Sequence, residues 1–226
     1  MTTNKPKLSV AIPTSGMENG DFFFRRCLDS LWNQSEQDFE IVVTDNSEDD
    51  IILEICNWYR TGIRYIKNPQ KGMAQNTNEA IRQSKGELIK ILYMDDFLAH
   101  DQAIENIIKK CKNMWLVTGC THVSGTDEFR TNPHRPRWSK NIHLGNNTIG
   151  SPSVLTIRNQ DPLLFDENMT WLLDCDYYKR LYEKYGKPSV INDINVAIGL
   201  HKGQATHTMG EDRKLQEYEY IKKKYA

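Results

Sequence analysis

Two short apolar runs in the first half of the chain end in acidic residues that could do chemistry. Asp95 and Asp96 follow the run 87–93, and Asp45 follows the run 40–44. Adjacent carboxylates repel one another, and removing them from water costs free energy. A hard divalent cation such as Mg²⁺ or Mn²⁺ relieves both costs, because it takes carboxylate oxygens together with substrate phosphates. The structural alternative is that the Asp pair only caps the turn that follows it.

Alternating strand and helix patterns indicate how these acidic residues come together. Apolar runs predict buried strands, and apolar residues at helical spacing predict the helices between them. The expected strands are Leu8–Pro13, Glu40–Thr44, Ile63–Lys67 and Glu87–Tyr93, and the expected helices are Phe22–Gln34, Asp49–Tyr59, Gly72–Ser84 and Asp101–Asn113. This alternation with short links predicts an α/β fold, in which helices cover both faces of a mainly parallel sheet.

Polar clusters stand at the carboxyl ends of three of the expected strands. They are Pro13-Thr14, Asp45-Asn46 and Asp95-Asp96. Ligands of open parallel sheets bind in the crevice beyond the carboxyl ends of the strands. We therefore expect the three clusters to converge on one crevice.

The second half of the chain has a less regular pattern. The expected strands are Ser153–Ile157 and Val190–Leu200, and the expected helices are Trp171–Tyr185 and Glu211–Tyr225. Gly186 and Pro188 are stop signals for the first of these helices. The segment Thr126–Asn147 is rich in Arg, His, Pro and Asn, and it predicts a long loop.

Composition and charge narrow the classes of function. The 226 residues are 38% hydrophobic and 26% charged, which is typical of a globular chain with a real core. A net charge of −1 argues against general nucleic-acid binding, which needs a basic face. The five cysteines form no C-x-x-C pair, which predicts free thiols in a reducing compartment. The absence of a signal-peptide pattern or a membrane-spanning run of roughly 20 apolar residues predicts a cytoplasmic protein.

The stretch from Leu8 to Leu98 carries a series of motifs that resembles the family 2, GT-A fold, inverting glycosyltransferases. In chain order the motifs are SVAIPT, CLDSLWNQ, EIVVTDNSEDD, KGMAQNTNEAIRQSKGE and LIKILYMDDFL. The resemblance implies one GT-A domain over residues 1–226. Residues 1–98 would bind the nucleotide-sugar, and residues 99–226 would bind the acceptor and carry the catalytic base.

The resemblance also implies roles for single residues around the donor. Thr14 and Asp45 match positions that hold the base and ribose, and Asp95 matches the last Asp of the D-x-D metal motif. Tyr93 replaces the first Asp of that motif. His201 matches a His that contacts the metal or the diphosphate in several relatives, although a lone His is more often a satisfied polar residue. The implied donor-binding residues are Pro13, Thr14, Asp45, Gly72, Asn76 and Asp96, and the implied ligands of Mn²⁺ or Mg²⁺ are Asp95 and His201.

A segment of the second half, FDENMTWLLDCDYYKRL, resembles the part of the family that carries the catalytic base. On this register Asp174 matches the base and Asp176 a structural acid, while Leu173 replaces a common Glu. An inverting transfer needs one carboxylate to take the proton of the acceptor hydroxyl. The structural alternative is that both acids only charge the first turn of a helix.

The resulting hypothesis is a metal-dependent inverting glycosyltransferase of glycan or polysaccharide biosynthesis. Its donor would be a UDP-, GDP- or dTDP-linked sugar, and its acceptor a carbohydrate or a lipid-linked glycan. The basic, aromatic C-terminus YEYIKKKYA leaves open a position against the inner face of a membrane. One alternative is a domain that binds a nucleotide-sugar or carbohydrate without transfer. Another is a sugar-phosphate nucleotidyltransferase. Such an enzyme would need a Gly-rich phosphate loop with Arg or Lys just after the first strand, and Pro13-Thr14-Ser15-Gly16 is a poor match to it.

Overall fold

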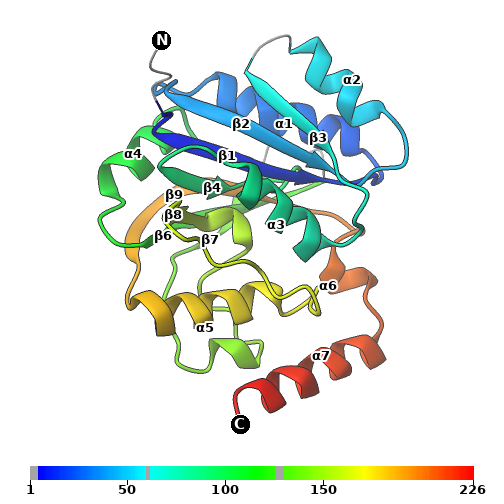
Figure 1. Ribbon diagram of the computed structural model, residues 1–226, viewed down its shortest axis with the longest axis vertical. Coiled ribbons are helices and arrows are strands. Elements are labelled where there is room, and N and C mark those ends of the chain that lie inside the picture. The colour runs from blue at the N-terminus through cyan, green and yellow to red at the C-terminus, as the bar shows by residue number, and fades with distance from the viewer. Residues whose placement is uncertain (1–4, 60–61, 126–129) are drawn as a thin grey trace.

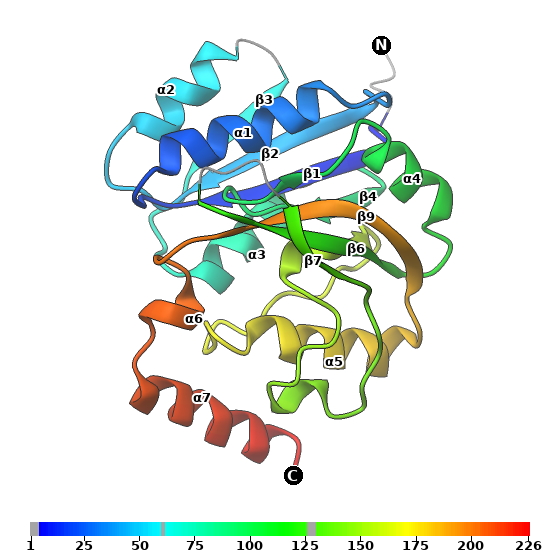
Figure 2. The same cartoon turned by 180° about the vertical axis from the view of Figure 1, so that it is seen from behind.

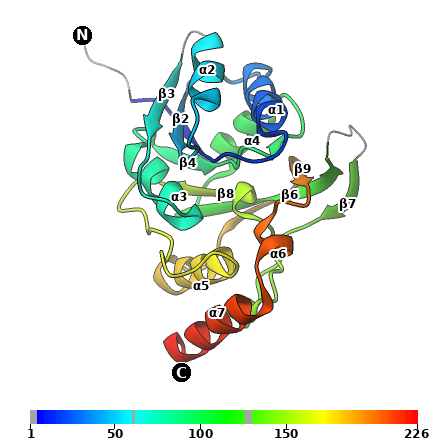
Figure 3. The same cartoon turned by 90° about the vertical axis from the view of Figure 1, so that its right-hand side faces the viewer.

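The computed structural model of the chain describes residues 5–59, 62–125 and 130–226. Within these residues the strands form one nine-stranded sheet with the order β3-β2-β1-β4-β8-β6-β9-β5, and β7 pairs with β6 beside this path. Helices α1, α2 and α4 lie on one face of the sheet, and α3 and α5 lie on the other (Figure 3). The predicted α/β fold with helices on both faces is confirmed.

The first half of the chain forms the parallel part of the sheet (Figure 1). Its strands are β1 (Leu8–Thr14), β2 (Phe39–Asp45), β3 (Ile63–Lys67) and β4 (Leu88–Ile91), and its helices are α1 (Gly20–Trp32), α2 (Ile51–Trp58), α3 (Met73–Gln83) and α4 (Ala103–Lys110). All seven residues of β1 are buried, because helices cover both of its faces. This is why the strand reads as a continuous apolar run rather than as an alternating one.

The second half extends the same sheet with mixed directions. Its strands are β5 (Phe97–Leu98), β6 (Trp115–Ser124), β7 (Arg130–His134), β8 (Leu155–Arg158) and β9 (Ser189–Leu200). β8 pairs antiparallel with both β4 and β6, and β6 in turn runs parallel to β9 and antiparallel to β7 (Figure 2). The predicted strands at β8 and β9 are confirmed, whereas the sequence analysis missed β6.

The prediction of a loop over Thr126–Asn147 is wrong in part. β7 and a short 3-10 helix at Ile142–Leu144 fall inside it, while residues 126–129 lie outside the described residues. The residues of β7 read Arg-Thr-Asn-Pro-His, which carries little intrinsic strand preference. The segment is a strand because the part of β6 beyond its pairing with β8 offers it backbone partners, with Cys120 opposite His134. Such pairing depends on tertiary contacts that composition does not reveal.

Helices α5 (Leu173–Tyr185), α6 (Ala205–Thr208) and α7 (Glu211–Lys224) complete the chain, together with a 3-10 helix at Pro152–Val154. α7 lies beyond α5, at the end of the molecule opposite to α2 (Figure 1). None of the helices formed by the described residues is both long and apolar enough to span a membrane. All five cysteines are free and buried, which confirms the expected free thiols.

The turn that carries the acidic pair is fixed by its close approach to β9. β4 ends at Ile91, so Asp95 and Asp96 lie in the turn after it rather than on the strand itself. Gly199 of β9 passes so near this turn that an added Cβ atom would overlap the carbonyl oxygen of Asp95. The backbone N–H of Gly199 donates to Asp96 Oδ1 at 2.9 Å. β9 therefore holds the turn in place.

We predict that Gly199→Ala lowers the free energy of unfolding by about 1–3 kcal/mol, because the new methyl group forces the two backbones apart. Urea unfolding measures this change. Gly210→Ala is the matched control, since nothing lies within 4 Å of a Cβ atom at that position. A Gly199→Ala protein as stable as this control would contradict the proposed close packing.

Candidate active site

One cavity of about 860 Å³ opens at the carboxyl ends of β1, β2 and β4. Its lining also includes the start of α5 and the chain that follows β9. It brings together eight residues that the sequence analysis singled out: Pro13, Thr14, Gly72, Asn76, Asp95, Asp96, Asp174 and His201. Asp45 is not among the residues that line it. The expected convergence on one crevice therefore holds for every predicted site residue except one.

Asp95 and His201 lie side by side on the wall of this cavity. Asp95 Oδ2 lies 3.0 Å from His201 Nε2, and their side chains are 13% and 12% exposed. The guanidinium of Arg26 donates to the carbonyl oxygen of Asp95 at 3.1 Å and lies over the ring of Phe97 at 4.5 Å. Arg26 thus holds the Asp95 backbone from behind, which leaves the carboxylate directed at the imidazole.

Asp96 lies deeper than its neighbour and is only 2% exposed. Burial and the nearby charge of Asp95 raise the pKa of Asp96 well above its ordinary value, although hydrogen bonds from Ser153 and Gly199 act against this. Asp96 therefore connects the turn to β9, whereas Asp95 is the more accessible member of the pair.

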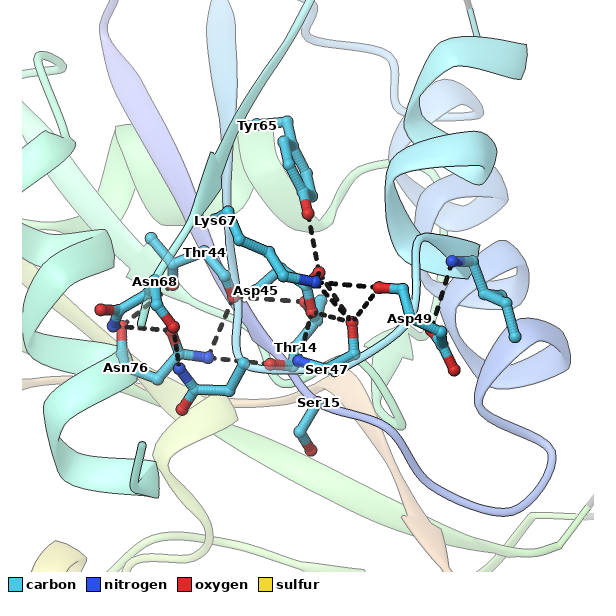
Figure 4. A network of polar contacts seen from close by, with 12 residues as sticks. Thr14, Ser15, Thr44, Asp45, Ser47, Asp49, Tyr65, Lys67, Asn68 and Asn76 are labelled. Atoms are coloured by element: carbon cyan, nitrogen blue, oxygen red, sulfur yellow. Dashed lines mark hydrogen bonds and ion pairs between the residues drawn. The ribbon is translucent and has the colours of Figure 1, made fainter. Parts of the chain in front are cut away.

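Asp45 is the centre of a buried hydrogen-bond network behind the cavity wall (Figure 4). Its Oδ1 accepts from the backbone N–H of Ser47 at 2.8 Å and from the Thr14 hydroxyl at 3.2 Å. Its Oδ2 accepts from the Tyr65 hydroxyl at 2.8 Å and from Lys67 Nζ at 3.2 Å. Burial raises the pKa of Asp45, but the hydrogen bonds from Ser47, Tyr65 and Lys67 outweigh it and hold the pKa below its ordinary value. In this structure the carboxylate supports Thr14 and Ser47, which do line the cavity.

Asn76 ties α3 to the ends of two strands (Figure 4). Its Nδ2 donates to the carbonyl oxygens of Thr14 and Thr44, each at 2.9 Å. Its Oδ1 accepts from Asn68 Nδ2 at 3.1 Å. Gly72, at the start of α3, has a φ of 127°, a backbone conformation that residues with a side chain rarely adopt. The loop at Gly72 and the strand ends are thereby fixed relative to one another.

Asp174 stands in the first turn of α5 and faces the same cavity. Asn147 Nδ2 donates to its Oδ2, and the backbone N–H of Cys175 donates to its Oδ1, each at 2.7 Å. Burial raises the pKa of Asp174 to about 6, against these hydrogen bonds. Asp176 instead is fully buried and bonds to Arg180 and Tyr225, as expected for a structural acid.

The lining includes residues that the sequence analysis did not select. Among them are Ser47, Lys71, Trp171, Gln204 and Thr206. A cation directly before Gly72 was a signal that could have drawn attention to Lys71. Gln204 and Thr206 carried no comparable signal, because they lie at the start of the short helix α6, which only the fold returns to the sheet edge.

The family model described as Glycosyl transferase family 2 matches residues 9–179 of the chain. The chain belongs to glycosyl transferase family 2. The match runs from β1 into α5, so it includes the strand ends, the Asp95 turn and Asp174. The sequence-based recognition of the family and of the enzyme class is therefore confirmed.

Several known proteins are similar to this family 2 chain. An uncharacterized protein of Mycobacterium tuberculosis, MT1568, is 26% identical over 96% of the chain and 75% of its own length. Glycosyltransferase GlyA of Streptococcus pneumoniae is 29% identical over 46% of the chain, and the match spans 15% of GlyA. Chondroitin synthase of Pasteurella multocida is 32% identical over 46% of the chain, and the match spans 11% of that protein.

Two solved structures share the fold. S. aureus TarS 1-349 in complex with UDP-GlcNAc has a TM-score of 0.73 at 20% identity, with 95% of this chain and 65% of that chain covered. The mannosyltransferase PcManGT from Pyrobaculum calidifontis, in complex with GDP-Man and Mn²⁺, has a TM-score of 0.66 at 17% identity. That alignment covers 99% of this chain and 65% of PcManGT. The GT-A-like class of the fold is therefore confirmed.

Asp95 and His201 fit a divalent cation that takes its remaining ligands from a substrate. A carboxylate and an imidazole 3.0 Å apart are oxygen and nitrogen donors, a set that suits Mn²⁺. Mg²⁺ is commonly bound by one or two carboxylates together with phosphate oxygens. Among the residues that the structure describes, no group of three or more His, Cys, Asp or Glu side chains is placed to hold a metal ion.

We predict that Asp45→Asn lowers the free energy of unfolding by about 1–3 kcal/mol at pH 7, because an amide group then faces the donors that the carboxylate satisfied. The lowered pKa of Asp45 stabilises the fold above the unfolded value of 3.8, and this contribution is lost as the pH falls through the folded value. The difference from wild type therefore shrinks in acid.

Urea unfolding at pH 7 and at about pH 3, below the unfolded pKa of Asp45, measures this difference. Asp193→Asn is the matched control, because the side chain of Asp193 is 68% exposed. Equal stability of the two variants at pH 7 would contradict a supporting role for the buried carboxylate.

Proposed function

We propose that this family 2 glycosyltransferase moves a sugar from a nucleotide-diphosphate sugar to an acceptor hydroxyl, with inversion at the anomeric carbon. The observation that carries the proposal is that Asp174, whose pKa is raised to about 6, lines the same cavity as the Asp95–His201 pair. A base poised near neutral pH and a cation site then face one shared volume. The acceptor we propose is a carbohydrate or a lipid-linked glycan.

The donor nucleotide is proposed to lie at the ends of β1 and β2. Pro13, Thr14, Gly72 and Asn76 line that part of the cavity. Asp45 would act from behind by fixing Thr14 and Ser47, which its hydrogen bonds support. TarS was solved with UDP-GlcNAc and PcManGT with GDP-Man, so both bases occur on this fold. UDP-, GDP- and dTDP-linked donors all remain within the proposal.

Asp95 and His201 are the proposed ligands of Mn²⁺ or Mg²⁺, and Asp96 is proposed to support the turn behind them. When bound, the cation would offset the negative charge that develops on the leaving diphosphate. Arg26 fixes the Asp95 backbone, so the carboxylate needs little rearrangement to bind. The lesser exposure of Asp96 supports its assignment as a neighbour of the site rather than as a ligand.

Asp174 is the proposed general base. It takes the proton of the acceptor hydroxyl while the acceptor oxygen bonds to the anomeric carbon, and the bond from that carbon to the diphosphate oxygen breaks. Asn147 donates a hydrogen bond to one carboxylate oxygen, and the Cys175 N–H donates to the other. These two bonds would hold the base in a fixed direction. A raised pKa makes the carboxylate a stronger proton acceptor than an exposed Asp.

We predict that Asp174→Asn lowers kcat for transfer by roughly 10²–10⁴-fold, the usual contribution of a general base. The variant would still bind a nucleoside diphosphate with Mn²⁺, as a thermal-shift titration would record. In the wild type, kcat should fall as the pH drops through about 6, because the base becomes protonated.

Stability separates this prediction from simple misfolding. A pKa raised from 3.8 to about 6 means that ionised Asp174 opposes folding, and this cost is fully present above pH 6. Asp174→Asn should therefore have a Tm at pH 8 that is no lower than that of the wild type. Retained turnover in this variant would remove Asp174 from its role.

We also predict that Asp95→Asn or His201→Ala loses most of the Mn²⁺-dependent part of the thermal shift caused by a nucleoside diphosphate. A ligand that binds only the folded state raises Tm, so the shift reports binding without any need for turnover. His207→Ala is the control, because His207 is exposed and lies outside the cavity lining. A full Mn²⁺-dependent shift in the two site variants would place the cation elsewhere.

A further inference from the structure

One wall of the cavity is formed by the chain that leads into α5. Thr170, Trp171, Leu173 and Asp174 all contribute to the lining. α7 supplies none of the lining residues, yet it lies against this wall from outside, beyond α5 (Figure 1). Its contacts with the wall include buried polar ones.

Glu217 of α7 is the deepest of these contacts. It is a charged side chain that is only 2% exposed. Its carboxylate accepts hydrogen bonds from three consecutive backbone N–H groups, those of Thr170 at 2.8 Å, Trp171 at 2.8 Å and Leu172 at 3.0 Å. Arg213 of the same helix adds an ion pair, with its Nε 3.7 Å from Glu217 Oε1.

These three N–H groups lie directly before the first residue of α5. The N-terminus of a helix leaves backbone N–H groups without partners and favours a negative charge. The N-cap residue of α5 is Leu172, which makes no side-chain cap hydrogen bond. Glu217 therefore binds the N–H of the N-cap residue and of the two residues before it, and it places a negative charge at the N-terminus of α5.

Residues at the C-terminal end of α7 bind two further carboxylates near the same wall, those of Asp166 and Asp176. Lys224 Nζ lies 2.6 Å from Asp166 Oδ2 and 2.8 Å from Asp176 Oδ1. The Tyr225 hydroxyl donates to Asp176 at 2.8 Å, and the Tyr220 hydroxyl to Asp166 at 3.0 Å. Contacts on both sides of residues 170–174 thus hold this wall against α7.

We propose that Glu217 is a positioning residue for sugar transfer, an inference that rests on the proposed function of Asp174. By fixing the backbone at residues 170–172, Glu217 sets where α5 begins and therefore where its first turn presents Asp174. It also sets the position of Trp171, which lines the cavity beside the base. Glu217 itself touches no substrate, since it lies outside the lining.

The test compares Glu217→Gln and Glu217→Ala with the matched control Glu219→Gln. Glu219 lies on the same helix, is 60% exposed in its side chain and pairs with Lys222 at 3.0 Å. Three quantities are measured: hydrogen exchange at the amides of residues 170–172, the thermal shift with a nucleoside diphosphate and Mn²⁺, and kcat and KM for transfer. All rates are taken well below the Tm of each variant.

We expect Glu217→Gln to lose part of the amide protection and to lower kcat at least tenfold, because one of its two acceptor oxygens becomes a donor. Glu217→Ala should lose more of both, while the nucleotide shift stays within error of the wild type in each variant. The control should match the wild type throughout. A purely structural role would lower Tm and leave kcat of the folded protein unchanged.

The outcomes separate this inference from the proposed function. Glu217→Gln protein that loses amide protection but keeps the wild-type kcat would overturn the positioning role alone. A wild-type chain that transfers no sugar would instead overturn the proposed function. If Glu217→Ala does not fold, Tyr225→Phe replaces it, since that change loosens the same wall at Asp176. A wild-type kcat in both remaining variants would equally exclude positioning by α7.

Discussion

The last backbone N–H and C=O groups of a parallel strand lose their partners in the neighbouring strand. Where these groups are buried, other groups of the protein must bond to them. In this chain buried side chains meet that requirement. Asn76 bonds the carbonyl oxygens at the ends of β1 and β2, and Asp96 accepts the N–H of Gly199. Asp45 binds the donors of the loop that follows β2. These bonds make the strand ends a rigid cavity wall rather than a frayed edge.

The same constraint sorts the carboxylates by their environment. Asp45 is surrounded by donors that hold its pKa low, so it is a fixed negative charge with no accessible lone pair to offer. Burial raises the pKa of Asp174, which has fewer donors and faces the cavity. Environments that push two carboxylates in opposite directions commonly divide structural support from acid–base work. Asp95 completes the division, because its more accessible carboxylate is directed at an imidazole.

The two halves of the chain meet through β4 and β8, whose antiparallel pairing makes a single sheet of both. This continuity places the Asp95 turn of the first half beside β9 and Asp174 of the second. The wall at the start of α5 is formed by a loop and a helix rather than by a strand. It is held by α7 through buried ionic contacts, which are costly to form and costly to break on one side only.

The sequence by itself determined the parallel strands of the first half, the family and eight of the residues that line the cavity. Apolar runs and helical spacing are local patterns, and the motifs at the strand ends are short. Only the tertiary structure decided that the polar segment of β7 is a strand, because the edge of β6 supplies its partners. It also decided that Asp45 lies behind the wall and that Glu217 bonds to the N-cap residue of a helix 45 residues earlier in the chain. These outcomes depend on contacts between distant parts of the chain, and no local pattern encodes which donor will face which carboxylate.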